Sequence, residues 1–279
     1  MSGTVASPFS ASVRSALARQ SRIHAWQLRS VHRRGFQSYL VKTQLESERR
    51  TEDETYELVV FVTNGELLGR SGVTLGPGDV ANLPKKIDEA VYMAGLGGDA
   101  PWQLPATGEW PRVEAFDPAL AGDQALATSR ALVEAWRTTV SEHTEARPSS
   151  MELFCGEDSV TLENSAGLVA HSSATRVSLL SLLLADGEHA SERVSWDERR
   201  RVADLDVKAI VGRVAEEAHD LTHAIVPPSG QYAVVIDADE IVALLSPIEA
   251  NASAQGLYDK SSRFEMGKPL PIEGSGANP

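Results

Sequence analysis

Residues 56–65 read YELVVFVTNG, and this stretch decides the class of fold. Residues 56–63 are rich in β-branched and aromatic side chains, which favour a strand. Asn64 and Gly65 follow at once, and a second apolar run occupies residues 67–75. Asn-Gly between two such runs is a strong hairpin signal, because both central positions of a type I′ turn need a positive φ. The sequence therefore predicts two antiparallel strands joined by a tight turn.

The same patterns predict further strands and helices on either side of this hairpin. The other predicted strands are residues 25–31, 36–45, 151–155, 159–163, 167–185 and 231–237, with turns at 156–158 and 164–167. After a disordered leader at 1–10, the predicted helices are residues 12–24, 79–94, 123–142, 206–223 and 238–245. Strands and packed helices follow one another without regular alternation, which predicts an α+β fold with antiparallel β-sheets.

Charge and cysteine content narrow the class of function. The formal net charge of −13 argues against a nucleic-acid-binding protein, because phosphate binding needs a surplus of Lys and Arg. The arginines between Arg14 and Arg50 form a local basic segment, which we interpret as a solvated face or a dock for an acidic partner. Cys155 is the only cysteine, so the chain has no internal disulfide and fits a reducing compartment.

Targeting signals are weak. No apolar run reaches the ~20 residues that a membrane-spanning helix needs. The amino terminus lacks the apolar core of a secretory signal. We therefore expect a cytoplasmic protein with no membrane partner. Because the amino terminus is rich in Arg and Ser, an organellar transit peptide stays open as the alternative.

The most tempting metal motif is His219-Asp220-Leu221-Thr222-His223. Two histidines four residues apart share a helix face and resemble the zincin H-E-x-x-H. On the helical wheel, however, both point about 120–160° away from the apolar stripe. We therefore predict solvent-facing histidines near a helix carboxyl end, where the helix dipole favours positive charge.

Other candidate sites are weaker still. No G-x-G-x-x-G or P-loop pattern occurs between a strand and a helix, so a nucleotide site is not supported. Cys155 ends the strand-like segment MELFC at residues 151–155, where we predict a buried, unreactive thiol.

Several motifs follow one another in a fixed order in the second half of the chain. They are Asn164-Ser165-x-Gly167, Pro228-Ser229-Gly230-Gln231-Tyr232-x-Val234-Val235-Ile236, Ala243-Leu244-Leu245, Gly256-x-Tyr258-x-Lys260-Ser261-x-x-Phe264 and Gly267-Lys268. The amino-terminal hairpin adds Val62-x-Asn64-Gly65-x-x-x-Gly69. Their order and spacing, over residues 25–270, resemble the TldD/PmbA family.

This resemblance implies a domain organisation. Residues 1–24 would be a leader and a basic helix, and residues 25–228 a TldD/PmbA-like amino-terminal α+β domain. Residues 229–279 would be the start of a shortened carboxyl-terminal domain, because family members continue much further as a β-rich domain. Either the protein is naturally short or the sequence is a piece of a longer one.

The resemblance also implies a function. TldD/PmbA proteins work as heterodimers on unfolded or small peptides, and the TldD-type subunit carries H-E-x-x-x-H on the helix after a V-V-I strand. The corresponding residues 245–254 read LSPIEANASA and contain no histidine. Zinc needs about three protein ligands, so Glu249 alone cannot hold it. Pro247 would also disturb the interior of a metal-bearing helix.

The chain is therefore expected to be a non-catalytic, PmbA/TldE-like partner subunit of a TldD-type zinc metalloprotease. The zinc would lie in the partner, and we assign no catalytic, cofactor-binding or metal-binding residue to this chain. Two alternatives stay open. One is a specialised peptide-maturation subunit in a biosynthetic pathway, and the other is a binding or regulatory protein without a protease partner.

Overall fold

The structure is a computed structural model that describes residues 7–108, 111, 113–265 and 267–268. The chain divides into two compact units, and the second begins after Ala224. Residues 1–6 of the expected leader, and the polar tail after residue 268, lie outside the described residues. Residues 8–10 are not a leader but the first turn of a helix, because the Ser7 hydroxyl caps it by accepting the Phe9 N–H at 3.2 Å.

The described residues of the first unit form six strands, four α-helices and three short 3₁₀ turns. The strands are β1 (Ile23–Val41), β2 (Gln44–Asn64), β3 (Leu67–Leu75), β4 (Arg147–Asn164), β5 (Val169–Ala185) and β6 (Ser191–Arg199). The helices are α1 (Pro8–Leu17), α2 (Leu83–Ala94), α3 (Gln124–Glu142) and α4 (Val207–Leu221). The 3₁₀ turns are η1 (Pro77–Asn82), η2 (Pro118–Leu120) and η3 (Val202–Asp204).

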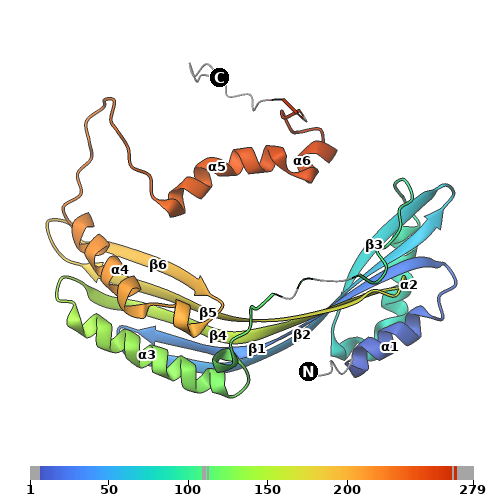
Figure 1. The fold of residues 1–279 in the computed structure, drawn as a ribbon, viewed down its shortest axis with the longest axis horizontal. Helices are drawn as coiled ribbons and strands as arrows, with labels where there is room; N and C mark the ends of the chain where they lie inside the picture. Colours follow the sequence, from blue (N-terminus) through green and yellow to red (C-terminus); the bar gives the residue numbers. More distant parts are fainter. Residues whose placement is uncertain (1–6, 109–110, 112, 266, 269–279) are drawn as a thin grey trace. The chain divides into compact units, whose positions relative to one another are not determined.

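One antiparallel sheet forms the centre of this unit, with the strand order β3-β2-β1-β4-β5-β6 (Figure 1). The predicted hairpin joins β2 to β3, but its two turn residues are Gly65 and Glu66, because Asn64 ends β2 and pairs with Leu67. Gly65 has a positive φ of 61° and Asn64 does not, so the turn is not the type I′ turn predicted at Asn64 and Gly65. The prediction of an α+β fold with antiparallel strands and packed helices is confirmed.

In two places, a pair of predicted strands is one long strand in the structure. Residues 25–31 and most of 36–45 belong to β1, which continues through Gly35 to Val41. The turn predicted at 156–158 was wrong, because β4 also continues through Gly156. Gly35 and Gly156 are cross-strand partners, so these glycines serve the close approach of two strands and not a chain reversal.

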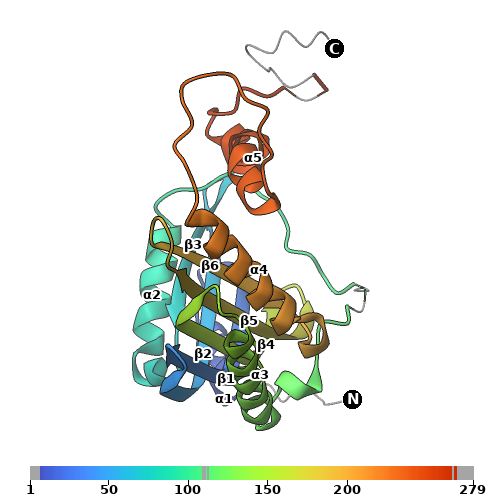
Figure 2. The same ribbon diagram turned by 90° about the vertical axis from the view of Figure 1, so that its left-hand side faces the viewer.

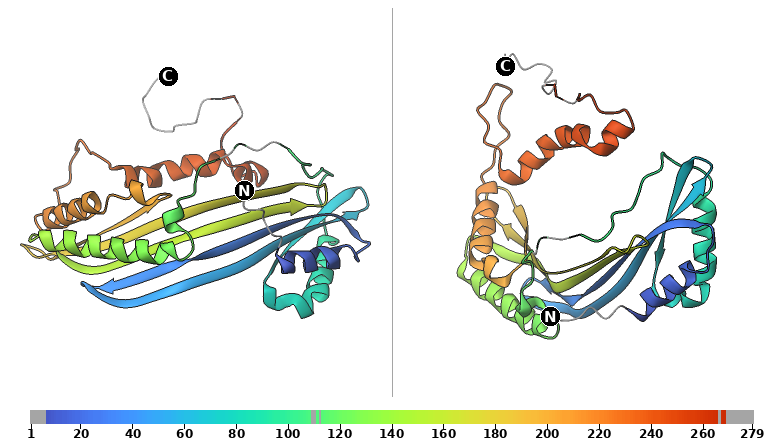
Figure 3. Two further views of the ribbon diagram at one scale, coloured as in Figure 1. Left: turned by 60° about the horizontal axis from the view of Figure 1, so that its bottom comes forward. Right: turned by 45° about the vertical axis from the view of Figure 1, so that its right-hand side comes forward.

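The four helices cover one face of the sheet as two separate pairs (Figures 2 and 3). Helices α1 and α2 pack over β2, β3 and the first part of β1, and α3 and α4 pack over the last part of β1 and over β4–β6. Each pair buries its own apolar cluster, centred on Tyr56 and Ile87 under the first pair and on Trp136 and Val214 under the second. The gap between the pairs leaves part of the helix-covered face polar.

The second unit contains α5 (Ala238–Ala252) and α6 (Ala254–Tyr258). The buried strand predicted at residues 231–237 was wrong. This segment has no regular secondary structure, and Val235 is 98% exposed. An apolar run forms a strand only where another strand pairs with it, and no described residue does so here. The predicted helix at 238–245 is present as α5, and it continues past Pro247.

Among the described residues, no helix combines the length and apolar character needed to cross a lipid bilayer.

Candidate functional site

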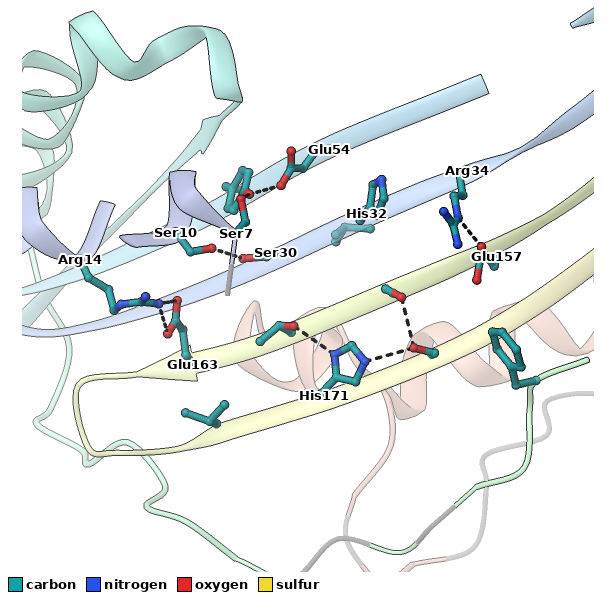
Figure 4. A pocket seen from close by; sticks show the side chains of 17 residues that line it. Ser7, Ser10, Arg14, Ser30, His32, Arg34, Glu54, Glu157, Glu163 and His171 are labelled. Atoms are coloured by element: carbon teal, nitrogen blue, oxygen red, sulfur yellow. Dashed lines mark hydrogen bonds and ion pairs between the residues drawn. The ribbon is translucent and has the colours of Figure 1, made fainter. Parts of the chain in front are cut away.

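A cavity of about 610 Å³ lies beside α1 on the helix-covered face of the sheet (Figure 4). Its walls come from α1, from four strands and from the segment before α3. The lining residues are Ser7, Ser10, Arg14, Ser30, Val31, His32, Arg34, Glu54, Tyr56, Phe116, Glu157, Ser159, Thr161, Glu163, Val169, His171 and Ser173. Most of these side chains carry a hydroxyl, an imidazole or a charge, so the cavity suits a polar ligand.

An ion pair fastens α1 to the sheet at one end of the cavity. Arg14 of α1 donates two hydrogen bonds to the Glu163 carboxylate of β4, at 2.9 and 2.8 Å. Glu163 is only 8% exposed, so its charge needs this partner. Beside the pair, the hydroxyls of Ser10 and Ser30 lie 3.4 Å apart. The helix and the strands therefore meet through polar contacts at this point.

The amino end of α1 is held by a second polar contact. The Tyr56 hydroxyl donates to the Glu54 carboxylate and lies 2.5 Å from the Ser7 hydroxyl. Burial raises the pKa of Tyr56, and the hydrogen bond to Glu54 raises it further. The phenol thus stays protonated as a donor on the cavity wall.

The far end of the cavity is closed by Arg34, which pairs with Glu157. The same Glu157 carboxylate accepts the Gly122 N–H at 3.1 Å. Both arginines of the cavity are thus already neutralised by carboxylates, which leaves no free cation among its described lining for an anionic ligand.

A chain of hydrogen bonds runs along β4 and β5 through the middle of the cavity. His171 contacts the Thr161 hydroxyl through Nδ1 and the Ser173 hydroxyl through Nε2, each at 3.1 Å. Ser173 also lies 3.1 Å from the Ser159 hydroxyl. A serine next to a histidine suggests a nucleophile and its base, but an activated triad also needs a group that fixes a charged imidazole. Here the neutral hydroxyl of Thr161 occupies that place, so these side chains do not form a Ser-His-Asp triad.

The sequence does not reveal this cavity, because its lining residues alternate with other residues on separate strands. One signal was available. His171 and Ser173, like Ser159 and Thr161, are polar residues spaced by two, which places them on one face of a strand. That face would ordinarily carry apolar side chains under a helix.

In the gap between the helix pairs, the neighbouring strands β1 and β4 approach each other closely at two glycines. Gly35 and Gly156 face each other there. A Cβ atom on Gly35 would lie 2.4 Å from the Cys155 carbonyl oxygen and 2.9 Å from the Gly156 Cα. A Cβ on Gly156 would lie 2.6 Å from the Arg34 carbonyl oxygen. Only glycine fits at this pair of positions, which we call the glycine crossing.

Comparison with known proteins identifies the fold. No protein-family model and no curated protein sequence matches the chain. Among solved structures, TldE from Thermococcus kodakarensis superposes on 91% of this chain with a TM-score of 0.66 and 15% identity. This chain has the TldE fold. The resemblance to the TldD/PmbA family is thereby confirmed at the level of the fold.

Two further structures share the TldE fold. Both are candidate modulators of DNA gyrase, from Thermotoga maritima and Bacteroides thetaiotaomicron. They cover 90% of this chain, with TM-scores of 0.72 and 0.71 and identities of 16% and 17%. The chain itself spans 57% of the length of each of the three solved chains. The fold is therefore shared along nearly all of this chain but only part of its neighbours.

The segment aligned by motif with the family's zinc helix lies in α5. Residues 245–252 are helical, and Glu249 is their only acidic side chain. Within the described part of the chain, no three side chains of His, Cys, Asp or Glu gather as metal ligands. Helix α5 takes Pro247 into its interior, where the missing N–H leaves one helical hydrogen bond unmade.

The two histidines of the His219–His223 motif lie side by side near the carboxyl end of α4. Their rings are 5.4 Å apart, and both side chains are exposed. The buried stripe of α4, which includes Val211 and Val214, lies on another face. His223 Nδ1 is 3.9 Å from a Glu188 carboxylate oxygen. The prediction of solvent-facing histidines is confirmed.

Cys155 is buried within β4, 2% exposed, under the α3–α4 helix pair. Burial raises the pKa of its thiol to about 12, and a hydrogen bond with Ser129 lowers the pKa only in part. The prediction of a buried thiol is confirmed. Desolvation of the thiolate is the reason to expect that this thiol reacts slowly.

We expect the Cys155 thiol to resist a chromogenic disulfide reagent in the folded chain. At pH 8, a pKa of about 12 instead of 9.0 leaves roughly a thousandfold less thiolate. The same raised pKa predicts stability that is present below pH 9.0 and falls as the pH rises toward 12, because the unfolded chain ionises first. The labelling rate should be compared with and without urea, and equal rates would contradict the burial of this thiol.

Proposed function

We propose that this chain is a non-metallated, PmbA/TldE-like member of the TldD/PmbA family. In this proposal it pairs in the cytoplasm with a TldD-like zinc metalloprotease that acts on unfolded or small peptides. The observation that carries the proposal is the TldE fold over 91% of the chain, together with a sequence at 245–254 that has no histidine. The motif order of the second half of the chain supports the same family.

The chemistry divides between the two subunits. A zinc protease needs protein ligands for the metal and a general base that takes a proton from the metal-bound water. The TldD-like subunit supplies both, through its H-E-x-x-x-H helix. This chain contributes a second wall of the substrate chamber, and its polar cavity offers hydroxyl groups and paired charges to a peptide backbone.

The test is to purify the chain alone and with a TldD-like protein from the same genome. We expect the two to co-elute at the mass of a heterodimer. Zinc should be stoichiometric in the complex and absent from the isolated chain. Peptidase activity on an unfolded protein should appear only in the complex, and chelation should remove the activity.

Two results would contradict this function. One tightly held zinc per isolated chain would show that this subunit has its own metal site. Failure to co-elute with the TldD-like protein, at concentrations well above a micromolar dissociation constant, would instead favour a binding or regulatory protein that acts without a protease partner. A variant of the TldD-like subunit without its metal histidines serves as the control, because it should still pair but not cleave.

A further inference from the structure

The two edges of the sheet are protected to different degrees. On the outer side of β3, Leu68 exchanges two backbone hydrogen bonds with Asp99 of the following loop, at 2.9 and 3.2 Å. On the outer side of β6, no described residue continues the sheet. An open edge presents unpaired N–H and C=O groups, and proteins commonly blunt such an edge with charge or cover it. The β6 edge is therefore available to another strand.

The exposed face of β6 is apolar at its centre. Val194 is 47% exposed and Trp196 is 55% exposed, and the two lie on the same side of the strand. Their partners on β5, Leu182 and Leu180, extend the apolar surface away from the edge. Exposed apolar side chains grouped in this way indicate a binding surface.

A row of aromatic side chains extends from this surface across the sheet toward β1. The ring of Trp196 lies 5.8 Å from that of Phe154 on β4, which in turn lies 5.8 Å from Tyr39 on β1. Arg49 covers the far end, with its guanidinium carbon 4.6 Å from the Tyr39 ring centre. The Phe154 ring supports the Trp196 indole on the side away from the sheet edge. A ligand at the β6 edge would therefore contact an indole that is already packed against another ring.

Acidic side chains flank the apolar centre. Glu192 and Glu198 lie two residues before Val194 and two residues after Trp196, so all four share one side of β6. Glu198 also lies 3.8 Å from Arg176 and accepts the Ser178 hydroxyl at 3.1 Å, so Glu192 is the less engaged of the two carboxylates. The net charge of −13 adds a long-range attraction for cations. The edge thus matches a strand with two apolar side chains at alternate positions and a basic side chain beyond each.

We propose that β6 binds an extended peptide of this basic-flanked apolar type as an added strand. Main-chain hydrogen bonds to the edge would supply affinity, and Trp196 and Val194 would select apolar side chains. Glu192 would select the Lys or Arg at one flank, and Glu198, which Arg176 already approaches at 3.8 Å, would contribute less at the other. The proposal depends on the proposed function only for naming this peptide as a substrate of the complex, since binding itself concerns β6 alone.

A second copy of the chain fits the same edge poorly. Antiparallel pairing of two β6 strands centred on Ser195 would place Glu192 of one copy opposite Glu198 of the other. On the other side of the strand it would place Arg193 opposite Asp197, but Glu217 and Arg213 of the same chain already bind these two residues. Like charges directly opposite each other destabilise a strand pair. The charge pattern therefore favours a basic peptide over self-association.

The experiment measures fluorescence anisotropy of a labelled heptapeptide, Lys-Thr-Val-Thr-Val-Thr-Lys, with the full chain. We expect saturable binding that weakens with salt. Replacing both Lys by Glu should abolish it. Two further peptides carry N-methyl groups on alternate amides, one set at the Val residues and the other at the Thr residues. Because a strand uses only one of its edges to pair, one methylated peptide should lose binding and the other should keep it.

Variants of the chain assign the site. Trp196→Ala should weaken binding about tenfold or more, as loss of a central aromatic anchor does. Glu192→Lys should weaken binding of the basic peptide and not that of a Thr-flanked one. Leu96→Ala is the matched control, because Leu96 is 62% exposed and follows α2, a helix that packs on β2 and β3. This variant should bind the peptide as the wild type does.

Several outcomes would overturn the proposal. They are absence of binding, equal binding of both methylated peptides, and equal affinities of the Trp196→Ala and Leu96→Ala variants. A homodimer that dissociates on Trp196→Ala would show that the face is covered by a second copy instead. Because the isolated chain is measured, none of these results bears on whether the chain pairs with a TldD-like protease, so the two proposals fail separately.

Discussion

Replacing Gly35 by alanine is expected to destabilise the first unit by about 3 kcal/mol, the usual scale for forcing an atom into a packed site. The added Cβ would lie 2.4 Å from a backbone carbonyl oxygen and 2.9 Å from a backbone carbon, neither of which can rotate away. Gly156→Ala is expected to do the same from the opposite strand. Urea unfolding followed by circular dichroism measures the loss.

Gly78→Ala is the matched control for this prediction. No atom lies within 4 Å of the Cβ that it would add, and its φ is not in the left-handed region. Removing a glycine at such a position stabilises a chain by about 0.5 kcal/mol through the entropy of the unfolded state. If Gly35→Ala behaved like Gly78→Ala, β1 and β4 would not approach as closely as the structure describes.

Arg14→Ala is expected to cost about 2 kcal/mol of folding free energy. It leaves the Glu163 carboxylate without either of the hydrogen bonds that it accepts, in a position that is 8% exposed. The value lies below that of a fully buried pair because the Arg14 side chain is 36% exposed. Chemical unfolding monitored by tryptophan fluorescence measures the change.

Arg29→Ala is the control for the ion pair. Arg29 also donates two hydrogen bonds to a carboxylate, that of Glu57, at 3.1 Å each. Both side chains are exposed, at 38% and 50%, so the loss should stay below about 0.5 kcal/mol. Equal losses for the two arginines would mean that Glu163 is solvated despite its position, and that α1 is not held by this contact.

The sequence predicted those elements that depend on the properties of neighbouring residues alone. The hairpin between β2 and β3 depends on one glycine, Gly65, at a positive φ, and the helices α3 and α4 follow from apolar spacing. The antiparallel α+β class followed from the order of these elements.

The misplaced boundaries have a common cause. A glycine inside a polar stretch signals a turn in sequence, yet Gly35 and Gly156 lie in the middle of strands. Each of the two positions requires glycine because the other strand approaches so closely there. A contact between residues far apart in the chain leaves no local sequence pattern. The strand predicted at residues 231–237 failed for the opposite reason. Its side chains favour a strand locally, but no described residue supplies the partner strand.

The candidate cavity was beyond sequence reasoning for a related reason. Its polar side chains are scattered over α1 and four strands, and only the pairing register brings Ser159 beside Ser173 and Thr161 beside His171. The edge surface at β6 was equally hidden. Val194 and Trp196 resemble any strand interior until the sheet order shows that their strand is the last one.

Because of the gap between the helix pairs, the first unit has two separate hydrophobic cores, and one continuous β-sheet connects them. Side chains under α1 and α2 cannot shift to fill a void opened under α3 and α4, because polar groups such as Arg14 and Glu163 stand between them. Each interior must therefore be repacked separately when its residues change, whereas any damage to the long strands that pass between them weakens both at once.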